Sequence, residues 1–113
     1  MDWASAKKLI ESEIVQNTDI NTNKSEYRIV KSIDEEVITV QVGELNYIKV
    51  TWEMLENCFK PISLGEKYDG NYFREHFPEH AKNHPCYVHV VGQIFVKSGV
   101  AIEQSEKYIE VIR

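Results

Sequence analysis

The fold depends on residues 85–99, which read PCYVHVVGQIFVKSG. Proline is tolerated at the first position of a helix, and glycine is favoured just past its end. Since Pro85 and Gly99 hold those places, the stretch predicts a helix over residues 85–98. Its apolar positions recur at helical spacing, and the face that they form comprises Val88, Val91, Ile94 and Phe95.

Two further patterns precede this helix. Residues 3–15 have the spacing of an amphipathic helix, and Asp2 can cap its first turn. Residues 17–26 are rich in Asn, Thr, Asp and Ser, which favour turns, so we expect a linker there. Alternating β-branched residues then predict an antiparallel meander of three strands within residues 27–50. In the first of these strands, the alternation places on one face Tyr27, Ile29 and Ile33.

From Thr51 the apolar period changes to that of helices. Thr51 can cap a helix that Pro61 ends within a few residues, and Asp69 can cap a short helix that Pro78 ends. The helix over residues 85–98 comes third. The sequence therefore predicts an α+β fold with an N-terminal helix, an antiparallel meander, three helices and a C-terminal hairpin. We expect the strands of that hairpin at residues 100–103 and 107–112.

Length and composition favour one domain over residues 1–113. The net charge is −5 and the pI about 5.3, a balance that disfavours nucleic acid because phosphate contacts need basic side chains. Cys58 and Cys86 form no CxxC pair, which favours a reducing compartment. The start of the chain is acidic and no apolar run reaches spanning length, so we expect a cytoplasmic protein without a membrane partner.

All four histidines lie within residues 76–89. Four-residue spacing places imidazoles on one face of a helix, where two of them can share a metal ion. A zinc site is therefore one hypothesis, although Pro78 interrupts the spacing and no HExxH motif is present. The other hypothesis is a polar connection between two helices, and we expect no cofactor. The candidate metal ligands are His76, His80, His84 and Cys86.

The second half of the chain resembles a known class of domains in the order of its expected helices and strands. Helix, short helix, longer helix and hairpin follow one another there, and in this order residues 51–112 resemble winged helix-turn-helix domains. The resemblance is architectural and involves no diagnostic motif. The segments that carry it are residues 51–55 (TWEML), 69–73 (DGNYF), 85–95 (PCYVHVVGQIF), 98–101 (SGVA) and 107–110 (KYIE).

The resemblance implies that residues 85–98 form a recognition helix that enters the major groove of DNA. The solvent-facing stripe of that helix would be His89, Gln93 and Lys97, where Gln can contact adenine and Lys can contact guanine or phosphate. Charge disfavours this hypothesis, since residues 51–99 hold five basic against six acidic side chains. DNA binding is therefore the second hypothesis for function.

Aromatic side chains bracket Gly70, and an exposed aromatic patch there would mark a partner contact. The candidate partner-binding residues are Tyr68 and Tyr72. Nucleophilic catalysis has little support, because no GxSxG motif or glycine-rich phosphate loop is present. We therefore expect a small, soluble, non-catalytic binding module that contacts a protein partner or itself, most simply as a homodimer. A small enzyme or zinc protein built on the histidine cluster is the third hypothesis.

Overall fold

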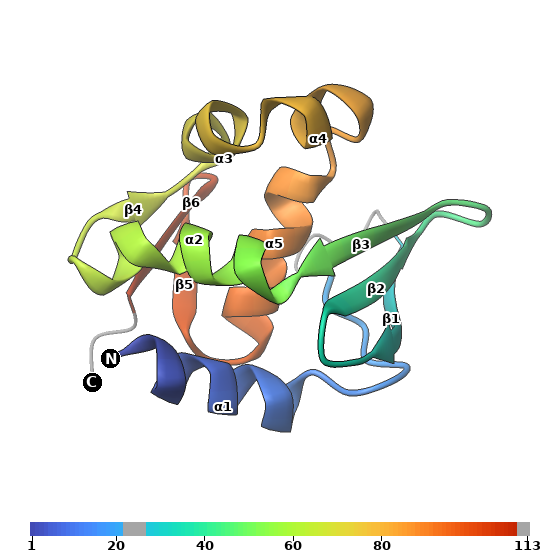
Figure 1. Cartoon of the computed structure of the whole chain (residues 1–113), viewed down its shortest axis with the longest axis horizontal. Helices are drawn as coiled ribbons and strands as arrows, with labels where there is room; N and C mark the ends of the chain where they lie inside the picture. The colour runs from blue at the N-terminus through green and yellow to red at the C-terminus, as the bar shows by residue number, and fades with distance from the viewer. Residues whose placement is uncertain (22–26, 111–113) are drawn as a thin grey trace.

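The computed structural model describes residues 1–21 and 27–110, and there the protein has the predicted α+β fold (Figure 1). An N-terminal helix leads into a three-stranded meander, followed by helices and a C-terminal hairpin. The helices are α1 (Trp3–Glu13), α2 (Trp52–Ser63), α3 (Gly70–His76), α4 (Pro78–Asn83) and α5 (Tyr87–Lys97). The strands are β1 (Arg28–Ile33), β2 (Val37–Val42), β3 (Tyr47–Thr51), β4 (Lys67–Tyr68), β5 (Ala101–Gln104) and β6 (Lys107–Glu110).

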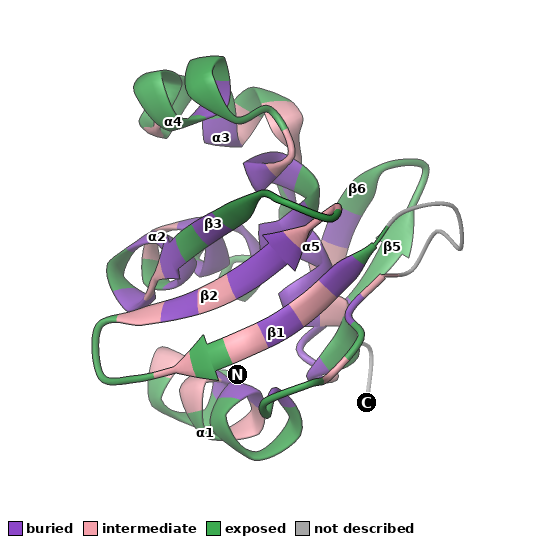
Figure 2. Ribbon diagram, turned by 90° about the vertical axis from the view of Figure 1, so that its right-hand side faces the viewer, coloured by how far each residue is buried: buried purple, intermediate pink, exposed green. Residues whose placement is uncertain are grey.

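Helix α5 lies at the centre, with α1, α2 and both sheets around it (Figure 1). It is buried over most of its circumference (Figure 2). Its exposed residues are His89 and Lys97. A helix that is apolar nearly all round is expected in such an interior position. The predicted helix is therefore confirmed, but it begins at Tyr87, because Pro85 and Cys86 form a turn before it.

The meander β1-β2-β3 is antiparallel, as predicted, and its inner face packs on the core. The expected face of the first strand is wrong. Arg28 and Val30 point inward, whereas Tyr27 is exposed and Ile29 only half-buried. The pairing register shifts between Val30 and Ser32, and such a bulge reverses the alternation of faces along a strand. The strand thus carries a buried arginine into the interior.

The outer edges of the meander are covered by other parts of the chain. Part of the predicted linker pairs with β1: Asn17 N–H donates to the carbonyl of Val30 at 2.7 Å, and Ile20 N–H donates to that of Arg28 at 3.0 Å. Residues 22–26 of that linker lie outside the described residues. At β3, the Tyr87 hydroxyl donates to the Lys49 carbonyl at 3.0 Å. Covered edges resist pairing with foreign strands.

The short helix that Asp69 caps ends just before Pro78, as predicted, but a further helix follows it. Pro78 begins this helix, α4, at the first position, where its missing N–H costs least. The structure thus has four helices after the meander where three were expected. Ala81 is the buried residue of α4, so this short helix lies at the periphery of the fold (Figure 2).

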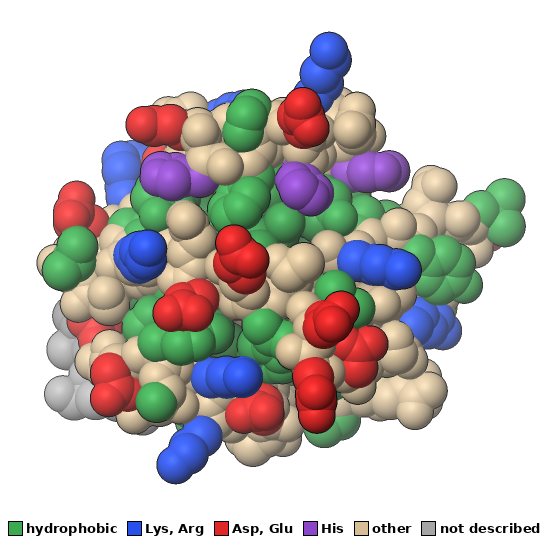
Figure 3. All heavy atoms as spheres, viewed as in Figure 1, with side chains coloured by type: hydrophobic (Ala, Val, Ile, Leu, Met, Phe, Trp, Pro, Cys, Tyr) green, Lys and Arg blue, Asp and Glu red, His purple; other side chains and the backbone are tan. Residues whose placement is uncertain are grey.

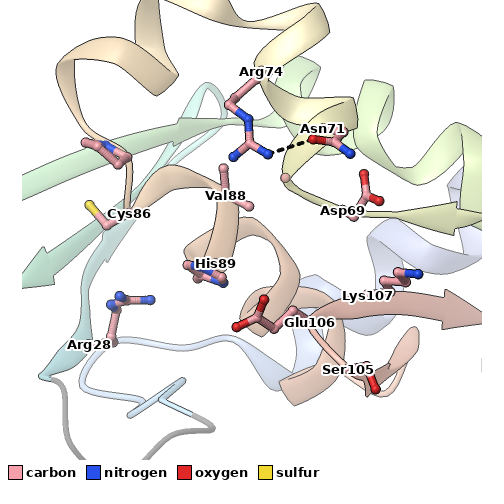
Figure 4. A pocket seen from close by; sticks show the side chains of 12 residues that line it. Arg28, Asp69, Asn71, Arg74, Cys86, Val88, His89, Ser105, Glu106 and Lys107 are labelled. Atoms are coloured by element: carbon pink, nitrogen blue, oxygen red, sulfur yellow. Dashed lines mark hydrogen bonds between the residues drawn. The ribbon is translucent and has the colours of Figure 1, made fainter.

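The C-terminal hairpin is confirmed as β5 and β6, and it gains a third strand that was not predicted. The two residues of β4 pair with β6, which gives a sheet of order β4-β6-β5. Residues 111 and 112 of the predicted last strand lie outside the described residues. This sheet and the start of α3 bring the β5–β6 turn close to the beginning of α5 (Figure 4).

Acidic and basic side chains are interspersed over the face of the molecule shown in Figure 3. Within residues 1–21 and 27–110, none of the helices has the length and apolarity that crossing a membrane requires.

Candidate functional site

A cleft of about 510 Å³ lies between α3, the start of α5 and the β5–β6 turn (Figure 4). Arg28 of β1 also lines it, so parts of the chain that are far apart in sequence build one surface. The sequence had pointed to Cys86 and His89 for other roles, and it gave no signal that the remaining residues come together. The lining comprises Arg28, Asp69, Gly70, Asn71, Arg74, Pro85, Cys86, Val88, His89, Ser105, Glu106 and Lys107.

Arg28 is held in place by a buried partner. Its side chain is only 5% exposed, and Nη1 donates a hydrogen bond of 2.7 Å to Oε1 of Gln93, itself 3% exposed. Cys86, His89 and Gln93 are spaced i, i+3 and i+7, which places them on one face of the helical segment. The hydrogen bond to Gln93 therefore holds the guanidinium of Arg28 beside His89 (Figure 4).

Arg74 occupies the opposite side of the cleft (Figure 4). Its Nη2 donates to Oδ1 of Asn71 at 2.8 Å, which orients the guanidinium. The group lies over Gly70, where an ideal Cβ atom would be 2.8 Å from Nη1. Since real Cβ atoms do not approach so closely, the absence of a side chain at Gly70 leaves room for this guanidinium.

Two carboxylates, Asp69 and Glu106, also line the cleft. Asp69 caps α3 and accepts a hydrogen bond of 3.0 Å from Tyr72 N–H, and its Oδ2 lies 3.9 Å from Nζ of Lys67. The lining thus holds three strong cations, Arg28, Arg74 and Lys107, against these two carboxylates. In a chain with a net charge of −5, the lining of the cleft is therefore positive by one charge.

The predicted DNA-contacting stripe is not a surface stripe. His89 and Lys97 are exposed, but Gln93 is buried and bonded to Arg28. The prediction failed because other parts of the fold cover the side of α5 that the helical pattern had assigned to solvent. On that side, Arg28 donates a hydrogen bond to the side-chain amide oxygen of Gln93. His89 opens onto the cleft, whereas Lys97 is absent from its lining.

The predicted aromatic partner site is also wrong in its placement. Tyr68 is fully buried, and its hydroxyl donates to the Val88 carbonyl at 2.9 Å. Tyr72 is half-buried, and its hydroxyl donates to the Asn57 carbonyl at 3.0 Å. Both tyrosines pack the helices together, because each phenol finds a backbone acceptor inside the fold. Exposed aromatic side chains lie instead on the meander, at Tyr27 and Tyr47.

The histidines contact aromatic rings. His76 stacks on Tyr72 with ring centroids 3.9 Å apart. His80 and His84 both approach the ring of Tyr87, at 5.4 Å and 6.1 Å. On the face shown in Figure 3, histidine side chains lie in a row.

The candidate zinc ligands His76, His80, His84 and Cys86 do not form a metal site. In the part of the chain that the structure describes, no group of three or more His, Cys, Asp or Glu side chains is placed to hold a metal ion. Non-helical residues at 77 and 84–86 interrupt the helical spacing on which that hypothesis depended.

The two cysteines differ in environment. Burial raises the pKa of the Cys58 thiol, which therefore serves as a small apolar core residue. Cys86 is half-buried at the cleft. Comparison of the chain with protein-family models, with curated proteins and with solved structures finds no match.

Proposed function

We propose that the protein is a small, non-catalytic binding module that holds an anionic group of its ligand in the cleft. The observation that carries this proposal is the convergence of Arg28 and Arg74 on one cleft, with His89 and Lys107 beside them. These are the two arginines of the described residues, and they come from different elements.

The guanidinium groups suit this role for two reasons. Each presents a planar fork of N–H donors that matches the oxygens of a carboxylate or phosphate. Both are also oriented before any ligand arrives, Arg28 by Gln93 and Arg74 by Asn71. Such preorganisation lowers the entropy that binding costs. Because Arg28 is buried, salt screens its charge less than that of an exposed lysine.

Titration calorimetry with inorganic phosphate and with succinate tests this proposal. At least one anion should bind saturably, and Arg74→Gln should weaken it at least tenfold. Lys49→Gln is the matched control, because it removes the same charge from an exposed position outside the cleft. Equal weakening by both substitutions would reveal only diffuse electrostatics, and absence of saturable binding of either anion would contradict the proposal.

Self-association is a second candidate function, favoured by an exposed apolar end of the meander. Leu45 is 88% exposed at the β2–β3 turn, and Tyr27 and Tyr47 are about half exposed. Tyr27 lies at this end too, since its carbonyl accepts a hydrogen bond from Gly43 N–H at 3.2 Å. Clustered apolar side chains of this kind mark protein contacts.

Light scattering at micromolar concentration tests this candidate. We expect a dimer that Leu45→Ser together with Tyr47→Ser shifts to monomer, since both changes remove exposed apolar area without touching the core. A monomer of 13.2 kDa throughout a tenfold dilution series would exclude it.

A further inference from the structure

The two arginines of the cleft lie on opposite sides of it (Figure 4). Arg28 comes from β1 and is held by its hydrogen bond to Gln93 of α5. Arg74 comes from α3, where its guanidinium lies over Gly70 and donates to Asn71. Each guanidinium is therefore oriented by an amide of its own, and the two reach the cleft from different elements.

The start of α5 forms the wall between the two arginines. This helix contacts α3 on one side and holds Arg28, through Gln93, on the other. It and the turn before it add three apolar side chains and one histidine to the lining, namely Pro85, Cys86, Val88 and His89. A ligand that reaches from one arginine to the other therefore passes over a largely apolar surface.

The cleft is large for a single small anion. Its volume is about 510 Å³, which is within the range of sites that take a whole small molecule. A lone carboxylate group is little larger than a water molecule, whose share of liquid volume is about 30 Å³. One such group therefore leaves most of the cleft, and one of its two arginines, to water.

The lining also holds carboxylates that repel an acid. Asp69 is already engaged, since it accepts a hydrogen bond from Tyr72 N–H at 3.0 Å. Glu106 is exposed, so water and salt screen its charge. The buried Arg28 is screened less, and the hydrogen bonds between a guanidinium and a carboxylate are charge-assisted and bidentate. The attraction at the arginines therefore exceeds the repulsion from these two carboxylates.

We propose that the ligand is a small dicarboxylate, with one carboxylate on Arg28, the other on Arg74 and its carbon chain over the start of α5. This inference rests on the proposed function, because it names the class of anion that the cleft binds. The ligand groups are carboxylates rather than phosphates because each side offers one guanidinium, whose planar fork pairs with the two oxygens of one carboxylate. The opposed arginines also favour a ligand whose acid groups point away from each other.

Two matched ligand pairs test this inference by titration calorimetry at about pH 8, where carboxylates are ionised. Succinate and butyrate have equally long carbon chains but two acid groups against one, and succinate should bind at least tenfold more tightly. Fumarate and maleate carry equal charge, but their carboxylates point in opposite directions in fumarate and to the same side in maleate. Fumarate should therefore bind at least fivefold more tightly than maleate.

Arg74→Gln should remove both preferences, because only one of the opposed guanidiniums then remains. Since Arg74 is exposed, this substitution leaves the core intact. Lys97→Gln is the control, because it removes an equal charge from an exposed residue of α5 outside the cleft and should preserve both preferences.

The outcomes separate this inference from the proposed function. Equal or reversed affinities within either pair, or binding of phosphate without binding of the dicarboxylates, would overturn the dicarboxylate assignment and leave the anion site standing. Preferences that survive Arg74→Gln, or that Lys97→Gln removes equally, would also overturn it. Failure of phosphate and of all four acids to bind would remove both.

Discussion

At the scale of single residues, Gly92 decides how the C-terminal sheet packs on α5. An ideal Cβ at this position would lie 2.1 Å from Cζ of Tyr108, so only glycine admits the ring. Tyr108 is buried and packs on Tyr68 with centroids 5.6 Å apart. Burial raises the pKa of the Tyr108 phenol, with the nearby Glu103 carboxylate adding to it. The sequence showed Gly92 only as an isolated glycine in a helix, because nothing local identifies the ring that it accommodates.

Gly92→Ala should lower the free energy of unfolding by about 3 kcal/mol, because the added methyl group overlaps a buried ring that cannot move aside. Urea denaturation measures this change. Tyr108→Leu provides the control: in that background the cost of Gly92→Ala should fall to less than half, since the two residues are in contact. A cost that is unchanged by Tyr108→Leu would mean that helix packing elsewhere excludes the methyl group.

Two exposed aspartates predict how stability depends on acid. Hydrogen bonds from Ser5 hold the pKa of Asp2 below its ordinary value of 3.8, and those from Val37 and Glu36 do the same for Asp34. Each carboxylate therefore stabilises the fold above its unfolded pKa, and this contribution is lost as the pH falls through the folded pKa.

Asn can still accept these backbone hydrogen bonds but does not titrate. The double substitution Asp2→Asn/Asp34→Asn should therefore reduce the drop in melting temperature between about pH 5 and about pH 2.5. Thermal melts followed by circular dichroism provide the comparison. Identical drops in the parent protein and the double variant would contradict the prediction.

At the scale of elements, the structure follows the sequence wherever a periodic pattern extends over several turns or a full strand. The central helix and the meander were predicted for this reason, with Thr51 and Asp69 as confirmed caps. The elements that the sequence did not predict are too short to show a period, since β4 has two residues and α4 has six. The inward face of β1 was misassigned because its bulge and the burial of Arg28 depend on tertiary partners.

The β5–β6 turn gives a prediction at this scale. Replacing Ser105 and Glu106 by Asn and Gly should raise the free energy of unfolding by about 1 kcal/mol, because this pair adopts the left-handed region with less strain. Urea denaturation measures the gain. A destabilised variant would show that Ser105 or Glu106 makes a stabilising contact that outweighs the strain.

At the scale of the whole molecule, the cleft is built from residues that only the tertiary fold brings together. Arg28 and Lys107 lie far apart in the sequence, yet both line it. Composition disfavoured an anion-binding site, because a net charge of −5 gives no indication that three basic side chains line one cleft. The histidine cluster contributes His89 to the cleft, whereas the other three histidines contact aromatic rings from α3, α4 and the residue that follows α4.

The overall arrangement also bears on DNA. A recognition helix must present a continuous exposed face to the major groove. Most of α5 is buried, and its exposed residues, His89 and Lys97, are separated by the buried Gln93. We therefore expect no retardation of a DNA duplex in a mobility-shift assay at low salt, where electrostatic binding is strongest. Weak retardation that Lys97→Glu and Lys7→Glu reduce equally would reflect diffuse attraction. Retardation abolished by Lys97→Glu alone would contradict the prediction, because a local contact through α5 would then carry the binding.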